Sequence, residues 1–232
     1  MDNEKTYETF LYLNNKYFII KIIKNNTLDK VYEEKYLIKD QSNHFQIREL
    51  ENFLDKNVYK IEKKTEYFIE TIHLILESDD FFSIKLSIKG NNNGNLITPQ
   101  SLSYSLNEAK EQCAKSLEKK RIIHMLIDNY HFNNKDYSYL PKNTKCENFS
   151  LDLRFICISN DIVKNLEEIL KKFQISINEI LSAEYIKSLF NHIDDDLILR
   201  GKQVLDGFNQ NEVKFSKKII RNKGFFERFF NF

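Results

Sequence analysis

Glycine and proline are scarce in this chain, at 5 and 2 of its 232 residues. Loops that cradle the phosphates of a nucleotide need glycine, because its missing side chain lets backbone N–H groups approach closely. Every glycine here is isolated, and neither a P-loop nor a GxGxxG pattern occurs. The sequence therefore predicts no phosphate-binding loop of either kind, and we expect no bound cofactor.

The chain also has no large excess of positive or negative charge. Lys and Arg number 35 against 34 Asp and Glu, which gives a net charge of +1. Proteins that hold nucleic acid by its backbone need clustered positive charge, so we expect no nucleic-acid partner. The apolar runs are far too short to span a bilayer. The polar opening, residues 1–5, does not have the pattern of a signal peptide.

Cysteine and histidine give no reactive or metal-binding pattern. Cys113, Cys146 and Cys157 are odd in number and form no CxxC pair, which fits a reducing compartment. Cys113 and Cys157 fall on apolar patterns and are predicted to be small core residues. The five histidines lack HxxxH and HExxH spacing, so we expect satisfied core or surface side chains and no metal site. The run Asp194-Asp195-Asp196 lacks the spacing of a calcium loop and is predicted to be a solvated linker.

Hydrophobic periodicity divides the chain into short elements. Asn14-Asn15 separates two apolar strands and is predicted to be a two-residue turn, because Asn tolerates positive φ. The first eighty residues read as strand, strand, strand, helix and strand, over 10–13, 17–23, 31–38, 46–64 and 68–76. Thr98-Pro99 has the composition of a helix start. The later elements are strands at 82–89, 121–128, 149–158 and 175–181, and helices at 99–117, 161–173 and 183–190. The aromatic stretch from Tyr130 to Tyr139 is predicted to be a packing or protein-contact loop rather than a base-stacking surface.

The last eighteen residues have a different character. Five Phe occur in the last eight residues, and six basic residues but one acid follow from Lys214 onward. On a helix, bulky apolar residues would share one side and basic residues the flanks, a pattern typical of helices that lie in a membrane interface. The predicted membrane-binding residues are Lys217, Lys218, Ile219, Ile220, Arg221, Phe225, Phe226, Arg228, Phe229 and Phe230. The alternative is a helix docked on the protein's own body.

The order of these motifs resembles the FtsA family of bacterial cell-division proteins, which are divergent actin homologues. The opening is similar to the start of an actin-like first lobe, and the middle is similar to the SHS2-type subdomain of that family. The similar stretches are Ile97-Thr98-Pro99-Gln100 with the helix to Ala109, Ile122 to Leu126 with Tyr130 and Pro141, 151–158, Asn165-Leu166, 180–183 and the tail at 225–230.

This chain departs from the family at its phosphate loop. The family has an Asp-x-Gly-Thr-type turn between its first two strands, whereas this turn is Leu13-Asn14-Asn15-Lys16, with no carboxylate and no glycine. A second lobe, which in the family carries the other phosphate loop and the main docking surface for FtsZ, is not evident either. ATP binding is therefore not carried over, and an FtsZ contact is in doubt.

Taken together, these patterns predict an α+β protein: an actin-like (ribonuclease H-like) first-lobe remnant with an inserted SHS2-type β-α-β-β-α-β subdomain. The predicted parts are residues 1–80, completed by about 176–192, an insertion over 81–175, a linker over 193–214 and an amphipathic helix over 215–232. The resemblance implies a non-enzymatic divisome adaptor on the cytoplasmic side of the cell membrane at the division site, which binds anionic lipid and division proteins and can self-associate. The alternatives are a soluble interaction module, such as a pilus-assembly relative with a docked tail, and a weak ATP-binding actin homologue.

Overall fold

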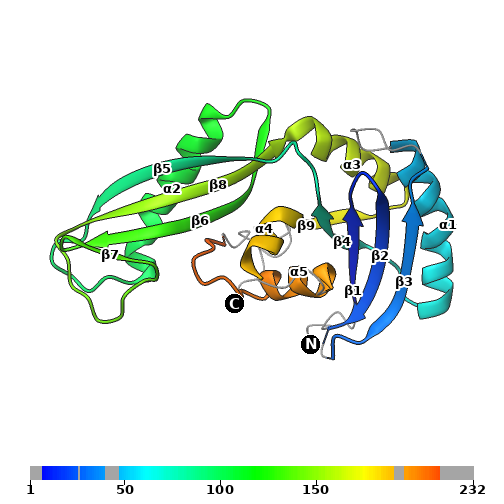
Figure 1. Ribbon diagram of the computed structural model, residues 1–232, viewed down its shortest axis with the longest axis horizontal. Coiled ribbons are helices and arrows are strands. Elements are labelled where there is room, and N and C mark those ends of the chain that lie inside the picture. The colour runs from blue at the N-terminus through cyan, green and yellow to red at the C-terminus, as the bar shows by residue number, and fades with distance from the viewer. Residues whose placement is uncertain (1–6, 26, 40–46, 191–195, 215–232) are drawn as a thin grey trace, which may run out of the picture.

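The structure is a computed structural model that describes residues 7–25, 27–39, 47–190 and 196–214. These residues form nine strands and five helices, arranged as two units along one long axis (Figure 1). Each unit is built on its own sheet. Within the described residues, no helix is long and apolar enough to cross a membrane. The mixed α/β class predicted from the sequence is confirmed.

The first sheet has five strands in the order β3-β2-β1-β4-β9. β2 is antiparallel to β1 and β3, while β4 is parallel to both β1 and β9. The strands are β1 (Tyr7–Leu13), β2 (Tyr17–Lys24), β3 (Lys30–Leu37), β4 (Thr71–Leu76) and β9 (Ser176–Ser182). The predicted order strand, strand, strand, helix and strand over the first eighty residues is confirmed.

Helices cover both faces of this sheet, which explains why β1 and β2 are nearly continuous apolar runs. Alternate residues of a strand point to opposite faces. Leu11 and Leu13 lie in the core with α1 (Ile47–Thr65) and α3 (Asn160–Lys172). Phe10 and Tyr12 lie in the core with α4 (Ala183–Leu189) and α5 (Leu197–Leu205).

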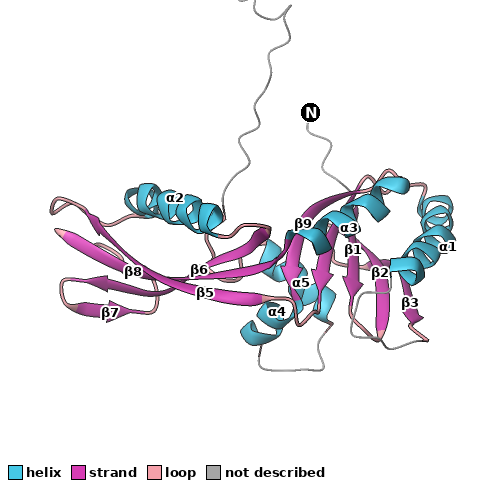
Figure 2. Ribbon diagram, turned by 90° about the horizontal axis from the view of Figure 1, so that it is seen from above, coloured by secondary structure: helices cyan, strands magenta, loops and turns pink. Residues whose placement is uncertain are grey.

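The second sheet is antiparallel and follows the order β5-β8-β6-β7. Its strands are β5 (Phe82–Asn91), β6 (Lys120–Phe132), β7 (Lys135–Tyr137) and β8 (Asn148–Ser159). α2 (Pro99–Ser116) lies along one face (Figure 2) and buries Leu102, Leu106, Ala109 and Cys113. The predicted start of this helix is confirmed, because the Thr98 side chain accepts a hydrogen bond from the Ser101 N–H and Pro99 is the first helical residue. Cys157 and Cys113 are buried in the same core, as predicted.

The chain returns to the first unit earlier than the predicted insertion boundary at residue 175. α3 follows β8 directly, and its buried residues Val163 and Leu166 belong to the core of the first sheet. The second unit is therefore a β5-α2-β6-β7-β8 excursion between β4 and α3. The order along the chain, β5-α2-β6-β7-β8-α3-β9, has one short strand, β7, more than the predicted β-α-β-β-α-β, and its last helix and strand complete the first sheet. The SHS2-type identity of the excursion stays a prediction.

Two loops differ from their predicted forms. In the β1–β2 turn, Asn14 acts through its side chain: its Oδ1 accepts hydrogen bonds from the N–H groups of Lys16 (2.9 Å) and Tyr17 (2.7 Å). Positive φ is not needed there, since neither Asn14 nor Asn15 adopts it. Asn133 and Asn134 do adopt it, with φ of 50° and 60°, and they close a hairpin between β6 and β7 inside the stretch predicted to be a loop.

The sequence predicts a linker with some local structure over 193–214, whereas the structure has α5 and an ordered segment after it. Asp196 begins α5 by accepting hydrogen bonds from the N–H groups of Ile198 and Leu199, and it also pairs with Lys21. Gly201 is a packing contact: a Cβ there would meet Ile75 Cδ1 at 2.8 Å. Glycine contributes no apolar side chain at this contact, so the hydrophobic periodicity of this short helix is weak in the sequence.

Candidate functional site

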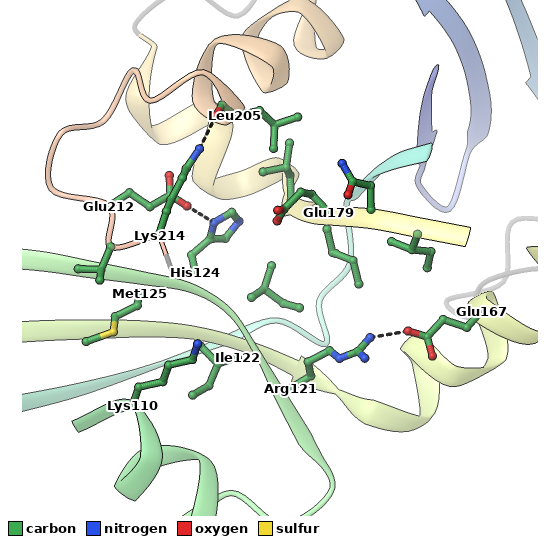
Figure 3. A pocket seen from close by; sticks show the side chains of 16 residues that line it. Lys110, Arg121, Ile122, His124, Met125, Glu167, Glu179, Leu205, Glu212 and Lys214 are labelled. Carbon is green, nitrogen blue, oxygen red and sulfur yellow. Dashed lines mark hydrogen bonds and ion pairs between the residues drawn. The ribbon is translucent and has the colours of Figure 1, made fainter. Parts of the chain in front are cut away.

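A groove of about 610 Å³ lies where the two sheets meet (Figure 3). Its lining comes from α2, β6, α3, β9 and the segment 205–214, which are far apart in the sequence. Ligand clefts in proteins usually measure about 300–1,000 Å³, so the groove is large enough for part of a peptide or a small molecule.

One wall of the groove is the edge of the first sheet. Residues 177–181 of β9 line it, and β9 is the last strand of its sheet, paired to β4 on its other side. An edge strand presents main-chain N–H and C=O groups that no neighbouring strand uses. Asn178 and Glu179 are exposed, whereas Ile180 and Leu181 are buried. The wall therefore combines main-chain polar groups with an apolar base.

The facing wall is β6, extended by a short segment near the end of the described chain. The Ile127 N–H donates to the Asn211 carbonyl oxygen (3.0 Å), and the Val213 N–H donates to the Met125 carbonyl oxygen (2.8 Å). Leu126 and Glu212 form an antiparallel bridge between these two bonds. The segment 211–213 thus adds a short strand to the free side of β6, beyond the part that pairs with β7.

A buried hydrogen-bond network joins the two walls. His124 is 2% exposed. Its Nε2 accepts a hydrogen bond from the Ser182 N–H (3.1 Å), so its proton resides on Nδ1, which donates to Glu212 Oε1 at 2.8 Å. The Tyr185 hydroxyl donates to Glu212 Oε2 (3.0 Å) and accepts from Asn209 Nδ2 (3.0 Å). Burial, together with the Glu212 charge, holds the pKa of Tyr185 well above its ordinary value.

This network joins the two units. Both ring nitrogens of His124 and both oxygens of Glu212 have protein partners. The prediction that His124 is a satisfied core histidine is confirmed. Sequence analysis did not identify this network. Glu212 and Asn209 lie in a stretch predicted to be a linker, and Glu212 is 88 residues from His124.

The rim of the groove carries both signs of charge (Figure 3). Arg121 Nη1 lies 2.7 Å from Glu167 Oε1, with both side chains more than 40% exposed. Lys214 Nζ donates to the carbonyl oxygens of Val204 and Leu205 and so satisfies the end of α5. Lys110 and Glu179 complete the charged lining. No single sign of charge dominates.

A second cavity, of about 1150 Å³, adjoins the β1–β2 turn where the resemblance places a phosphate loop. The polar groups at this turn bond to one another. The Tyr12 hydroxyl donates to Glu77, Asn14 Nδ2 donates to the Tyr12 oxygen (2.9 Å), and Lys187 pairs with Glu77 (2.7 Å). Burial opposes the charge on Glu77, yet the hydrogen bonds from Lys187 and Tyr12 hold its pKa below the ordinary value. Both polar atoms of the Asn14 side chain are thus bonded within the turn and to Tyr12.

The other sequence-predicted residues are distributed as follows. The membrane-binding residues between Lys217 and Phe230 lie outside the described residues, as do Asp194 and Asp195. Among the residues that the structure describes, no group of three His, Cys, Asp or Glu side chains is placed to hold a metal ion. Burial raises the pKa of Cys157 to about 12, which makes its thiol unreactive. Tyr130 and Phe132 lie in the core of the second unit, as expected for a packing role, and Tyr139 is exposed.

Comparison with known proteins gives low similarities. No protein-family model matches the chain, and no curated protein does. Among solved structures, the chain is similar to the cytoplasmic domain of EpsL, an inner membrane component of the type II secretion system of Vibrio cholerae. That match has a TM-score of 0.36 and 10% identity, and it covers 78% of this chain and 57% of that one.

Two further structures are similar at the same level. A PilM–PilN type IV pilus biogenesis complex matches with a TM-score of 0.46 and 7% identity, over 77% of this chain and 48% of that one. A Bacteroides thetaiotaomicron protein described as having an actin-like ATPase fold and unknown function matches with a TM-score of 0.36 and 13% identity, over 82% of this chain and 58% of that one. The chain thus spans about half the length of the structures it matches.

Proposed function

We propose that this chain is a non-enzymatic adaptor that binds an extended segment of a protein partner in the groove between its two sheets and is tethered to a membrane by residues 215–232. The observation that carries the proposal is the groove itself, which has the edge of β9 as one wall. Extended peptides bind such edges by adding a strand, with main-chain hydrogen bonds for affinity and flanking pockets for specificity.

The groove has the features that this binding mode needs. Asn178 and Glu179 are exposed and directly precede buried Ile180 on β9, so the wall offers polar side chains next to an apolar one. The His124–Glu212 network fixes the spacing of the two walls without using the exposed edge groups. A site that is ordered before binding loses less conformational freedom on association.

The proposed membrane tether would begin beside the groove. Residue 214 is the last described residue, and the segment that leads to it forms part of the groove wall. Each inserted Phe contributes about 1.5–3 kcal/mol to membrane binding, and each basic residue near an anionic leaflet contributes about 1 kcal/mol. A partner that is itself at the membrane would then meet the groove at the membrane surface.

The partner class is the finer part of the proposal. The resemblance of the sequence to the FtsA family favours division proteins, FtsZ among them, at the division site. A pilus-assembly-like interaction module of the same fold is the alternative. The structural matches have TM-scores below 0.5 and do not choose between the two.

A photo-crosslinking residue at Asn178 tests the groove in cells that make the full chain. Tyr59, 69% exposed on α1 and far from the groove lining, is the matched control position. We expect a defined covalent product from position 178 and none from position 59, and the identity of the product decides the partner class. The same products from both positions, or none from position 178, would count against the groove.

Vesicle co-sedimentation of the full chain tests the tether. Phe226→Glu with Phe229→Glu should weaken binding to anionic vesicles by at least about 100-fold, since two inserted aromatic side chains are lost. Tyr59→Glu with Phe68→Glu changes two exposed aromatics on the body and should leave binding unchanged. If the tail variant instead keeps its vesicle binding, or lowers the melting temperature sharply, the tail is docked on the body and the tether proposal fails.

A further inference from the structure

We infer that the outer edge of β5 pairs with the β5 of a second copy of this chain, antiparallel and about a two-fold axis, so that the two second sheets become continuous. β5 is the last strand of its sheet and pairs with β8 on one side. All ten of its residues pair with β8 in one unbroken register, without a bulge or a proline. Among the described residues, no other strand pairs with its outer edge.

Two of the other sheet ends in the described part of the chain are blunted, and the third, β9, lines the groove. β3 has a register shift against β2 and carries mixed charges. β7 has three residues. Short strands, bulges and charges are the devices by which proteins prevent edge pairing. β5 has the length and regularity of an edge that is available for pairing.

The apolar side chains of β5 are only partly buried, and a strand paired with its outer edge would bury them further. Ile84, Leu86 and Ile88 lie on the α2 side and are only partly buried, although they pack against the core. Lys85 and Ser87 lie on the opposite, exposed face. A neighbouring strand on the outer edge would cover the apolar row while leaving the polar row in solvent.

The main-chain groups that face outward can be identified from the ladder. The Asn92 N–H donates to the Glu147 carbonyl oxygen (2.7 Å), in register with the β5–β8 pairs. Hydrogen-bonded pairs alternate along an antiparallel ladder, so the even-numbered residues of β5 point toward β8. The N–H and C=O groups of Ser83, Lys85, Ser87 and Lys89 therefore point to the outer edge.

Of the two-fold axes at the three central residues of β5, Lys85, Leu86 and Ser87, only the axis at Leu86 keeps like charges apart. With the axis at Leu86, each Lys85 faces the second copy's Ser87, and each Lys89 faces its Ser83. An axis at Lys85 would place Lys85 opposite Lys85, and an axis at Ser87 would place Lys85 opposite Lys89. Like charges directly opposite are destabilising, and a shift by one residue would place apolar side chains on the polar face.

The register at Leu86 is also complementary in charge. Ser87 Oγ donates to Asp152 Oδ1 at 2.6 Å on the neighbouring strand β8. The second copy's Lys85 would therefore approach a hydroxyl backed by a carboxylate. On the other face, Ile84 would face Ile88 and Leu86 would face Leu86. Every cross-strand pair near the axis is thus apolar with apolar or Lys with Ser.

Sedimentation velocity of the full chain tests the inference by opposite charge changes at Ser83, which is exposed. Ser83→Asp places a carboxylate opposite Lys89 twice per dimer and should tighten the dimer by about 2- to 30-fold, whereas Ser83→Lys should weaken it by a similar factor. Ser103→Asp and Ser103→Lys, on the exposed side of α2, make the same changes in net charge and should leave the dissociation constant unchanged.

A cysteine pair tests the register directly. Under mild oxidation, a mixture of Lys85→Cys and Ser87→Cys chains should give a cross-linked heterodimer in preference to either homodimer. A chain that stays monomeric at all concentrations overturns the inference. So does a dimer whose dissociation constant moves in the same direction for both Ser83 variants, or a cross-link formed preferentially between two Lys85→Cys chains.

Discussion

Removing the Glu212 carboxylate should uncouple the two units. Its oxygens accept hydrogen bonds from His124 Nδ1 at 2.8 Å and from the Tyr185 hydroxyl at 3.0 Å, and its side chain is 7% exposed. Hydrogen bonds to a charged group contribute about 1.5–3 kcal/mol each. Glu212→Ala leaves both buried donors without an acceptor, so we expect the free energy of unfolding to fall by about 3–6 kcal/mol.

Urea denaturation followed by circular dichroism measures this loss. Glu212→Gln should cost less, because its amide oxygen still accepts from one donor while its NH₂ group faces the other. Glu167→Ala is the matched control, since it breaks the exposed ion pair with Arg121 and should cost less than about 1 kcal/mol. If Glu212→Ala costs no more than Glu167→Ala, the network does not hold the units together and our account of the joint is wrong.

Two further changes test the body of the protein. The hydrogen bonds from His131 to Asp136 and Asp152 raise the pKa of His131 above its ordinary value, so their contribution to stability is full below about pH 6.5 and is lost as pH rises through the raised pKa. His131→Asn should therefore flatten the fall in stability above pH 6.5, and an unchanged pH profile of unfolding would contradict this. Gly201→Ala should lower the free energy of unfolding by about 1–3 kcal/mol, because its Cβ would meet Ile75 Cδ1 at 2.8 Å, and an unchanged melting temperature would contradict the close packing of α5.

The elements that sequence analysis predicted well are those whose signal is local. β1 and β2 are buried on both faces and appear as apolar runs, and α1 buries one regular stripe. The helix start at Thr98-Pro99 depends on residues within one turn. Composition and spacing over a few residues are sufficient for such elements.

The features that sequence analysis did not predict depend on contacts between residues that are far apart in the sequence. The groove is formed by β6, β9 and the segment 205–214, and its joint links His124 to Glu212 across 88 residues. α5 contributes nine residues with a glycine at its contact point, so its apolar pattern is too short to recognise. The packing of α3 on the first sheet is likewise determined by tertiary contacts, because the sequence of an amphipathic helix does not indicate which sheet the helix covers.

The pairing of 211–213 with β6 has a mechanical consequence. A pull on the chain beyond residue 214 reaches the body through the Lys214 side chain, which is bonded to the end of α5, and along the main chain first through the bond from the Val213 N–H to the Met125 carbonyl oxygen. Behind that bond lie the Glu212–His124 contact and the bond from Ile127 to Asn211, so the load passes into β6, which is flanked by β8. Tension applied from a membrane would thus act on the groove wall before it reached either core. It would act on β6, the strand that forms one wall of the groove.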